Sequence, residues 1–177
     1  MSTSRDTLIK LRALEPEDLE ILYQIENDRE LWEVGTANVP YSRYALNNYV
    51  MCAANDIYAD KQVRLVMENE HGMVVGLLDL INFDPRHLRA EVGIVVIKQH
   101  RGKGYGELAL EKAVDYCRDF LHIHQLYAFV DVNNGASLEL FKKVGFSQTA
   151  CVKDWIFDGC NYSNTYLMQF FLQKIHN

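Results

Sequence analysis

The fold of this chain is decided by the stretch Glu91-Val92-Gly93-Ile94-Val95-Val96-Ile97-Lys98-Gln99-His100-Arg101-Gly102-Lys103-Gly104-Tyr105-Gly106, which continues as Glu107-Leu108-Ala109-Leu110-Glu111-Lys112-Ala113. Its first part is a nearly unbroken run of β-branched residues, which predicts a strand buried on both faces. Its last part has apolar residues at a spacing typical of a helix. Three glycines at alternate positions lie between the two. We therefore expect a strand that passes through a glycine-rich turn directly into a helix.

The predicted turn is suited to bind phosphate. The first amides of a helix have no partner inside the helix, and glycines let the backbone approach a ligand. The helix dipole, Arg101 and Lys103 add positive charge. The Walker and dinucleotide patterns do not fit, because Gly104 is followed by Tyr105 and the third glycine comes one residue early. The stretch predicts a pyrophosphate-bearing ligand, and the alternative is a connection without a ligand.

Composition limits the other possibilities. The 177 residues, of which 49% are apolar, predict a single domain over residues 1–177 with a sizeable core. A net charge of −6 argues against a nucleic-acid partner. The four cysteines lack paired spacing, which favours free thiols over disulfides or zinc, and no apolar run is long enough to span a membrane. We expect a cytoplasmic protein with no membrane partner.

The remaining elements follow from periodicity and turn residues. Strands are predicted at 8–14, 62–69, 73–83, 89–97, 125–130, 147–157 and 162–172, and helices at 16–27, 42–54, 104–120 and 134–144. The inner face of the helix at 42–54 stays open between two sets, which are Tyr44, Asn48 and Met51 or Ala45, Tyr49 and Cys52.

The spacing Gln99-x-x-Gly102-x-Gly104 resembles the signature of the GNAT acyl-CoA N-acyltransferases, and the order of elements is similar across nearly the whole chain. The resemblance implies an α/β (α+β) fold with a mixed six- to seven-stranded sheet, about four helices and splayed parallel central strands. It also implies that acetyl-CoA (coenzyme A) is the cofactor. Its pantetheine arm would pair with main-chain groups of Ile94, Val95 and Val96. Its pyrophosphate would bind the amides of Arg101, Gly102, Lys103, Gly104, Tyr105 and Gly106.

A second motif runs from Asp131 to Phe146 and is similar to the Asn-x-x-Ser/Ala…Gly-Phe segment of the ribosomal-protein N-terminal acetyltransferases and the spermidine acetyltransferases. By this resemblance Asn134 would bind the pantetheine arm. The alternative is that Asn134 caps the helix that it precedes, since asparagine is a favoured N-cap. Both roles can hold at once.

The expected chemistry is attack of an amine on a thioester. An alkylamine is mostly protonated at pH 7, so a general base raises the reactive fraction. Glu91 is the candidate, at the mouth of the expected gap and where related enzymes carry their base; the alternative is a surface pair with Arg89. Relatives use a tyrosine acid at the position of Phe141, which has no proton to give. The resemblance then implies Ser137 as the donor to the leaving sulfur, because it matches the serine proposed for that role in the ribosomal-protein acetyltransferases; a plain helix-surface serine is the alternative.

The acceptor is a small-molecule or peptide amine, and its identity is the least determined feature. Acidic and aromatic side chains suited to a cation are Trp32, Glu33, Tyr41, Asp79, Asp84, Trp155 and Asp158, each of which has a structural alternative. The stretch Asn38-Val39-Pro40-Tyr41-Ser42 lacks the acids that spermidine enzymes carry there, which favours a protein N-terminus or another small amine. A polyamine acetyltransferase and a catalytically weak coenzyme A-binding module remain alternatives. The aromatic strand at 162–171 could support a homo-oligomer.

Overall fold

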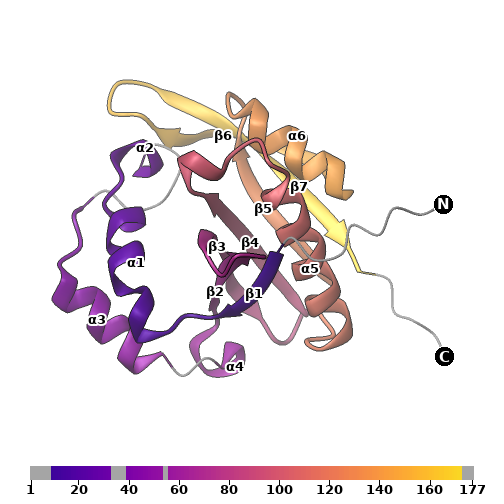
Figure 1. Cartoon of the computed structure of the whole chain (residues 1–177). Coiled ribbons are helices and arrows are strands. Elements are labelled where there is room, and N and C mark those ends of the chain that lie inside the picture. Colours follow the sequence, from indigo (N-terminus) through magenta and orange to yellow (C-terminus); the bar gives the residue numbers. More distant parts are fainter. Residues whose placement is uncertain (1–8, 33–38, 54–55, 173–177) are drawn as a thin grey trace.

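The computed structural model describes residues 9–32, 39–53 and 56–172, and Figure 1 shows them as one mixed sheet with helices on both faces. The seven strands lie in the order β1-β2-β3-β4-β5-β7-β6, and only β4 and β5 pair in parallel. Their bounds are β1 Ile9–Ala13, β2 Val63–Asn69, β3 Val74–Asp84, β4 Arg89–Val96, β5 Gln125–Asp131, β6 Ser147–Phe157 and β7 Tyr162–Phe171. The predicted strands are therefore confirmed to within a few residues.

The helices divide between the two faces of the sheet. Their bounds are α1 Leu19–Glu26, α2 Arg29–Trp32, α3 Arg43–Cys52, α4 Ile57–Asp60, α5 Tyr105–Asp119 and α6 Gly135–Val144, with single 3-10 turns η1 Pro16–Asp18 and η2 Lys98–His100. The apolar faces of α5 and α6 pack on one side of the sheet, and those of α1 and α3 pack on the other. No helix among the described residues is long and apolar enough to cross a membrane.

The predicted fold class is confirmed, with two differences in the helices. The one-turn helices α2 and α4 were not predicted, because four residues are too few to show a period. Both predicted inner faces of α3 are wrong, since its buried residues are Leu46 and Val50, while Tyr44 is 76% exposed. Leucine and valine four positions apart form one apolar stripe, which buries more apolar surface than either polar-containing set.

The parallel pair β4 and β5 separates along its length. The two strands pair at Arg89 with Gln125, Ala90 with Leu126 and Glu91 with Tyr127. Beyond Glu91, β4 stays paired with β3 up to Val96, and β5 stays paired with β7 up to Asp131. Each strand therefore keeps its outer partner while the inner pairing ends, and the predicted splay is confirmed. We call the space beyond Glu91 and Tyr127 the β4–β5 gap.

Candidate active site

The turn between β4 and α5 owes its shape to two glycines. Gly102 and Gly104 have φ angles of +75° and +84°, in the left-handed region that favours glycine. No atom of the described residues lies within 4 Å of where their Cβ atoms would be, so the loop is open around them. Gly106 serves packing instead, because its Cβ would lie 3.2 Å from Leu140 Cδ2 and 3.6 Å from Val96. Its missing side chain lets the start of α5 approach α6 and β4.

The loop presents a row of free amides. The first helical hydrogen bond of α5 runs from the Leu108 amide to the Gly104 carbonyl, at 3.2 Å. Among the described residues, the amides of residues 102–107 donate to no backbone carbonyl outside a regular element, and those of the first turn have no intrahelical partner. Arg101 differs from the predicted set, because its amide donates to the Lys98 carbonyl at 3.3 Å. These amides, at the positive end of a 15-residue helix, are suited to bind an anion.

The main-chain groups of β4 alternate between β3 and the gap. The Ile97 amide donates to the Val75 carbonyl of β3 at 2.9 Å, and the Val95 carbonyl lies so close to Gly76 that a Cβ there would be 2.1 Å away. The main-chain N–H and C=O groups of Val95 therefore point toward β3. Because these groups alternate in direction along a strand, those of Ile94 and Val96 point into the gap. Of the three residues predicted to contact the pantetheine arm, Ile94 and Val96 have main-chain groups that point into the gap, and Val95 does not. The Val96 carbonyl also accepts from Arg101 Nε at 3.0 Å.

The start of α6 carries the second motif. Asn134 is the N-cap, and its Oδ1 accepts from the Ser137 amide at 3.1 Å. The alternative of a capping role is thus confirmed, while the NH2 group of the side chain donates to no group of the described residues. Ser137 lies half-buried in the first turn. Phe141, one turn on, is 4% exposed and packs edge-on against Phe146 with ring centroids 5.0 Å apart, so it belongs to the core.

Glu91 lies at the last paired position before the β4–β5 gap and is half-buried. Its carboxylate accepts from Asn82 Nδ2 at 2.8 Å, where an irregularity in β3 gives Asn82 a φ of +51°. The alternative of a pair with Arg89 is wrong, because Arg89 binds Asp84 at 3.1 Å.

Tyr127 is a site residue that the sequence analysis missed. It is the parallel partner of Glu91, on the same face of the sheet. Burial raises the pKa of its hydroxyl, and the nearby Glu91 carboxylate adds to the effect. The group therefore stays protonated at neutral pH and remains a hydrogen-bond donor. Only the register of β4 on β5 could have revealed this neighbour, and the register depends on the tertiary fold.

Two of the predicted acceptor residues have neighbours on the face of the sheet that carries Glu91, away from α5. Asp79 is opposite Gly93 in the β3–β4 register. Trp155 stacks on Phe129 of β5, with ring centroids 5.5 Å apart. Both residues therefore border the surface that continues from the gap on the side of α1.

The other predicted acceptor residues have structural roles or lie elsewhere. Trp32 Nε1 donates to the Glu26 carbonyl, and the Tyr41 main chain exchanges two hydrogen bonds with the Asn27 side chain. Asp84 and Asp158 accept amides within their own turns, and in each case these hydrogen bonds hold the pKa of the carboxyl below its usual range. Glu33 lies outside the described residues. Asp79 and Trp155 are therefore the two predicted acceptor residues with neighbours on the face of the sheet that carries Glu91, and the acceptor role of the whole set stays a prediction.

Asp79 belongs to a mostly buried charged network. Both of its carboxylate oxygens accept from Arg64, at 2.7 and 2.8 Å, and Arg64 also binds Glu26 of α1. Burial lowers the pKa of Arg64, but its hydrogen bond to Asp79 and the charges of both carboxylates outweigh burial and raise it. Arg64 is therefore always charged. One guanidinium faces two carboxylates, which leaves one negative charge without a counterion inside the network.

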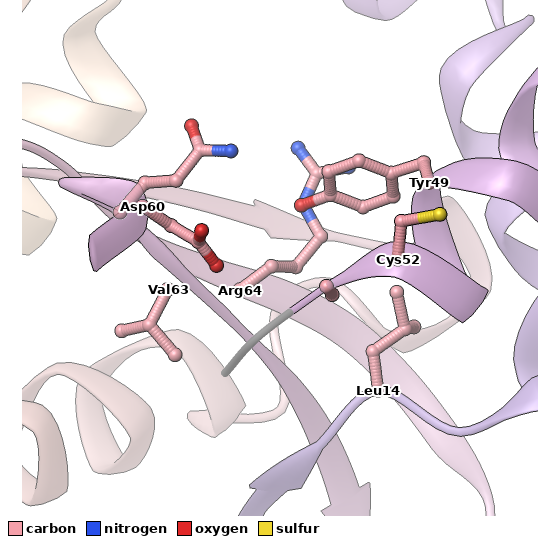
Figure 2. Close-up of a pocket in the computed structure, with 8 residues that line it drawn as sticks. Leu14, Tyr49, Cys52, Asp60, Val63 and Arg64 are labelled. Atoms are coloured by element: carbon pink, nitrogen blue, oxygen red, sulfur yellow. The ribbon is translucent and has the colours of Figure 1, made fainter. Parts of the chain in front are cut away.

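A pocket of about 230 Å³ lies beyond Arg64, away from the gap. Figure 2 shows Arg64 beside the ring of Tyr49. The guanidinium carbon lies 5.7 Å from the ring centroid. The pocket is lined by Leu14, Tyr49, Cys52, Ala53, Asp60, Gln62, Val63 and Arg64. None of these is a predicted site residue, and Arg64 is the lining residue that also belongs to the charged network.

Comparison with known proteins agrees with this geometry. A family model described as an acetyltransferase (GNAT) domain matches residues 9–147. The spermidine N(1)-acetyltransferase of Escherichia coli K12 is 30% identical, covering 92% of this chain and 86% of the relative. A putative ribosomal N-acetyltransferase of Bacillus subtilis is 26% identical over 84% of this chain and 83% of its own.

Solved structures give the same picture. The spermidine N-acetyltransferase of Vibrio cholerae in complex with CoA and spermine has a TM-score of 0.86 and 26% identity, covering 94% of this chain and 97% of that one. A dodecameric structure of the Vibrio cholerae enzyme has a TM-score of 0.78 and 25% identity, covering 93% of this chain and 94% of its own. The likeness therefore extends over nearly all of both chains.

Proposed function

This chain belongs to the GNAT acetyltransferase family, and we propose that its acceptor is a small, positively charged primary amine. It is an acetyl-CoA-dependent N-acetyltransferase. The observation that carries this conclusion is the β4–β5 gap, which opens beside free amides at the start of α5 and has a carboxylate, Glu91, at its closed end. The free amides suit a pyrophosphate, the main-chain groups along the gap suit an extended amide-containing arm, and the Glu91 carboxylate suits a reacting amine.

The cofactor is assigned to the gap by the hydrogen-bonding groups around it. The amides of residues 102–107 and the side chain of Lys103 match the pyrophosphate. The main-chain groups of Ile94 and Val96 and the NH2 of Asn134 match the amides of the pantetheine arm. Asn134→Ser keeps a capping oxygen but removes the NH2 donor. We expect this variant to bind coenzyme A several-fold more weakly with an unchanged melting temperature, and unchanged affinity in calorimetry would remove Asn134 from the cofactor site.

The chemistry assigned to the protein is proton removal followed by direct attack within a ternary complex. Glu91, directly or through one water, takes a proton from the acceptor ammonium. The amine nitrogen then forms a bond to the thioester carbon, the carbon–sulfur bond breaks, and the nitrogen loses its second proton to the departing thiolate or to water. Ser137 donates a hydrogen bond to the departing thiolate, whose pKa, in the usual thiol range near 8.5, lets it leave without a strong acid. Ser137→Ala should lower kcat only a few-fold, and an unchanged kcat would exclude this contact.

The choice of a small amine rests on the relatives and on local charge. Relatives that cover most of this chain are named as spermidine acetyltransferases. A protein N-terminus is the second candidate, which the Bacillus subtilis relative and the missing acids at 38–42 favour. The acidic network at Asp79 favours an acceptor with additional positive charge, which a peptide N-terminus does not always have.

A panel of acceptors tests the proposal. Purified protein and acetyl-CoA are mixed with spermidine, spermine, a monoamine and peptides with free N-termini, and released thiol is measured. We expect kcat/KM for spermidine to exceed that for the peptides by at least about 10-fold. This ratio corresponds to an activation free energy lower by about 1.4 kcal/mol. A preference for peptides would replace the small amine by a protein N-terminus. If the protein binds coenzyme A tightly but releases no thiol with any amine, it is a coenzyme A-binding module rather than an enzyme.

We also propose that the chain forms a homo-oligomer through its C-terminal hairpin. The side chains of Phe157, Tyr162 and Phe171 on β6 and β7 are 57%, 63% and 55% exposed, and β6 is an edge strand. An exposed aromatic edge of this kind is suited to pair with a second copy. The dodecameric structure of the Vibrio cholerae enzyme supports this proposal.

A further inference from the structure

Gly93 is a glycine that neither the backbone nor the packing requires. It lies inside β4, opposite Asp79 of β3, and beyond the last pair that joins β4 to β5. Its φ angle is outside the left-handed region. Within the described parts of the chain, an added Cβ would meet only the Asp79 Cβ, at an ordinary 4.0 Å. Gly76 is the contrast, because a Cβ there would be 2.1 Å from the Val95 carbonyl.

Such a glycine calls for another explanation, because glycine weakens the interior of a strand. A strand glycine without a structural reason often marks a place where a ligand approaches closely. Gly93 is partly exposed although β4 is the central strand of the sheet. The empty volume above it therefore faces solvent, on the side of the sheet away from α5.

The residues around Gly93 on this side are of two chemical kinds, carboxylates and aromatic rings. Glu91 lies two positions earlier on the same face, and Asp79 lies across on β3. Tyr127 and Phe129 lie on β5, on the same face, with their rings edge-on and their centroids 5.8 Å apart. We call Asp79, Glu91, Gly93, Tyr127 and Phe129 the acceptor surface. It has a carboxylate on each of β3 and β4, aromatic rings on β5, and no side chain at Gly93 itself.

The charge on this surface favours a cation. Arg64 is shared between Asp79 and Glu26, so one of their two negative charges has no counterion within the network. Glu91 has a neutral amide, Asn82, as its hydrogen-bond partner. Aromatic faces such as those of Tyr127 and Phe129 attract an ammonium group as well. Carboxylates and rings together match an alkylammonium chain.

We infer that Gly93 determines acceptor specificity: its missing side chain leaves the space in which the alkyl chain of a cationic amine lies between the carboxylates and the rings of the acceptor surface. This inference rests on the proposed function, because it places the acceptor of the same reaction. It assigns Gly93 a positioning role and no part in proton transfer. A side chain at this position occupies the acceptor's place without touching the amides that hold coenzyme A.

The test is a size series at position 93. Gly93→Ala and Gly93→Val are compared with the unmodified enzyme for the KM of the amine, kcat, coenzyme A affinity by calorimetry and melting temperature. We expect the amine KM to rise about 3-fold with alanine and at least about 10-fold with valine, as bulk fills the space. Coenzyme A affinity should stay unchanged, and the melting temperature should stay equal or rise, because alanine and valine favour strands more than glycine does.

A second variant tests the charge of the acceptor surface. Asp79→Asn keeps the shape of the side chain but removes one carboxylate from the network. We expect the KM of a polycationic amine to rise several-fold, while the KM of a monoamine changes less. A monoamine that the unmodified enzyme uses as well as a polycationic amine would overturn the charge-dependent part of the inference.

The outcomes separate this inference from the proposed function. If the unmodified enzyme releases no thiol with any amine, the proposed function fails before Gly93 is tested. If it is active and Gly93→Val leaves the amine KM unchanged, the specificity role of Gly93 is wrong. If Gly93→Ala lowers both the melting temperature and coenzyme A affinity, the glycine is required by the fold, and the inference is overturned as well.

Discussion

Four carboxylates that look alike in the sequence acquire different roles from their partners. Asp84 and Asp158 accept amides in turns, and Asp79 is bound by Arg64 through both oxygens. Glu91 has only the neutral Asn82 among the described side chains that hydrogen-bond to it. A carboxylate that is not neutralised by a cation is free to accept a proton, so Glu91 is the one suited to act as a base.

The first prediction concerns Glu91. Replacing it by glutamine keeps the shape and the hydrogen bond from Asn82 but removes the basic group. We expect kcat/KM for the amine to fall about 100-fold near neutral pH, within the usual range for loss of a general base. The pH–rate profile should also change, because the proposed basic group is absent.

The control for this prediction is Glu111→Gln, which removes an exposed carboxylate on α5 away from the gap. Its kinetics should equal those of the unmodified enzyme. Coenzyme A affinity should be the same in both variants. A Glu91→Gln enzyme with an unaltered pH–rate profile would rule out Glu91 as the base.

At the scale of the element, the loop between β4 and α5 shows that glycines in one motif serve different purposes. Gly102 and Gly104 provide left-handed backbone in open space, while Gly106 allows α5 to approach α6. The spacing in the sequence does not distinguish the roles of these three glycines. The structure separates the glycines that shape the anion site from the one that packs the helix.

The second prediction compares two glycines of similar conformation. Gly104 has φ +84° at the start of α5, and Gly72 has φ +71° in the β2–β3 turn, with no described atom within 4 Å of either added Cβ. Alanine at either position should lower the free energy of unfolding by about 1 to 2 kcal/mol, the cost of a left-handed L-residue. Urea unfolding measures this change.

Coenzyme A binding should distinguish the two variants. Gly104→Ala places a methyl group and strained backbone beside the free amides, so we expect affinity in calorimetry to fall at least about 10-fold, or 1.4 kcal/mol. Gly72→Ala should bind coenzyme A like the unmodified protein. Equal affinity in both variants would place the pyrophosphate away from the α5 loop.

At the scale of the whole molecule, one continuous sheet holds the site together. The gap exists because β3 and β7 keep β4 and β5 apart, each on its own side. The network of Glu26, Arg64 and Asp79 connects α1 with β2 and β3 next to that gap. Strands from both halves of the chain thus contribute to one candidate site, and the single domain over residues 1–177 stays a prediction.

The third prediction concerns assembly. We expect the purified protein to have a mass in light scattering several times the 20.5 kDa of one chain. Phe157→Asp introduces a charge on the exposed hairpin and should lower this mass, because a carboxylate is costly to bury in an apolar interface. Tyr44→Asp, at another exposed aromatic residue, is the control and should keep the mass unchanged. A monomeric unmodified protein would contradict the proposed oligomer.

The sequence by itself predicted the order of strands and long helices, the loop at the start of α5, the Asn134 cap and the family, because these depend on local periodicity, turn residues and fixed motif spacing. Only the tertiary structure placed Tyr127 beside Glu91, directed Val95 away from the gap and bound Asp79 to Arg64. These neighbours come from strands far apart in the sequence. Their meeting depends on register, and register is fixed only when the whole sheet packs.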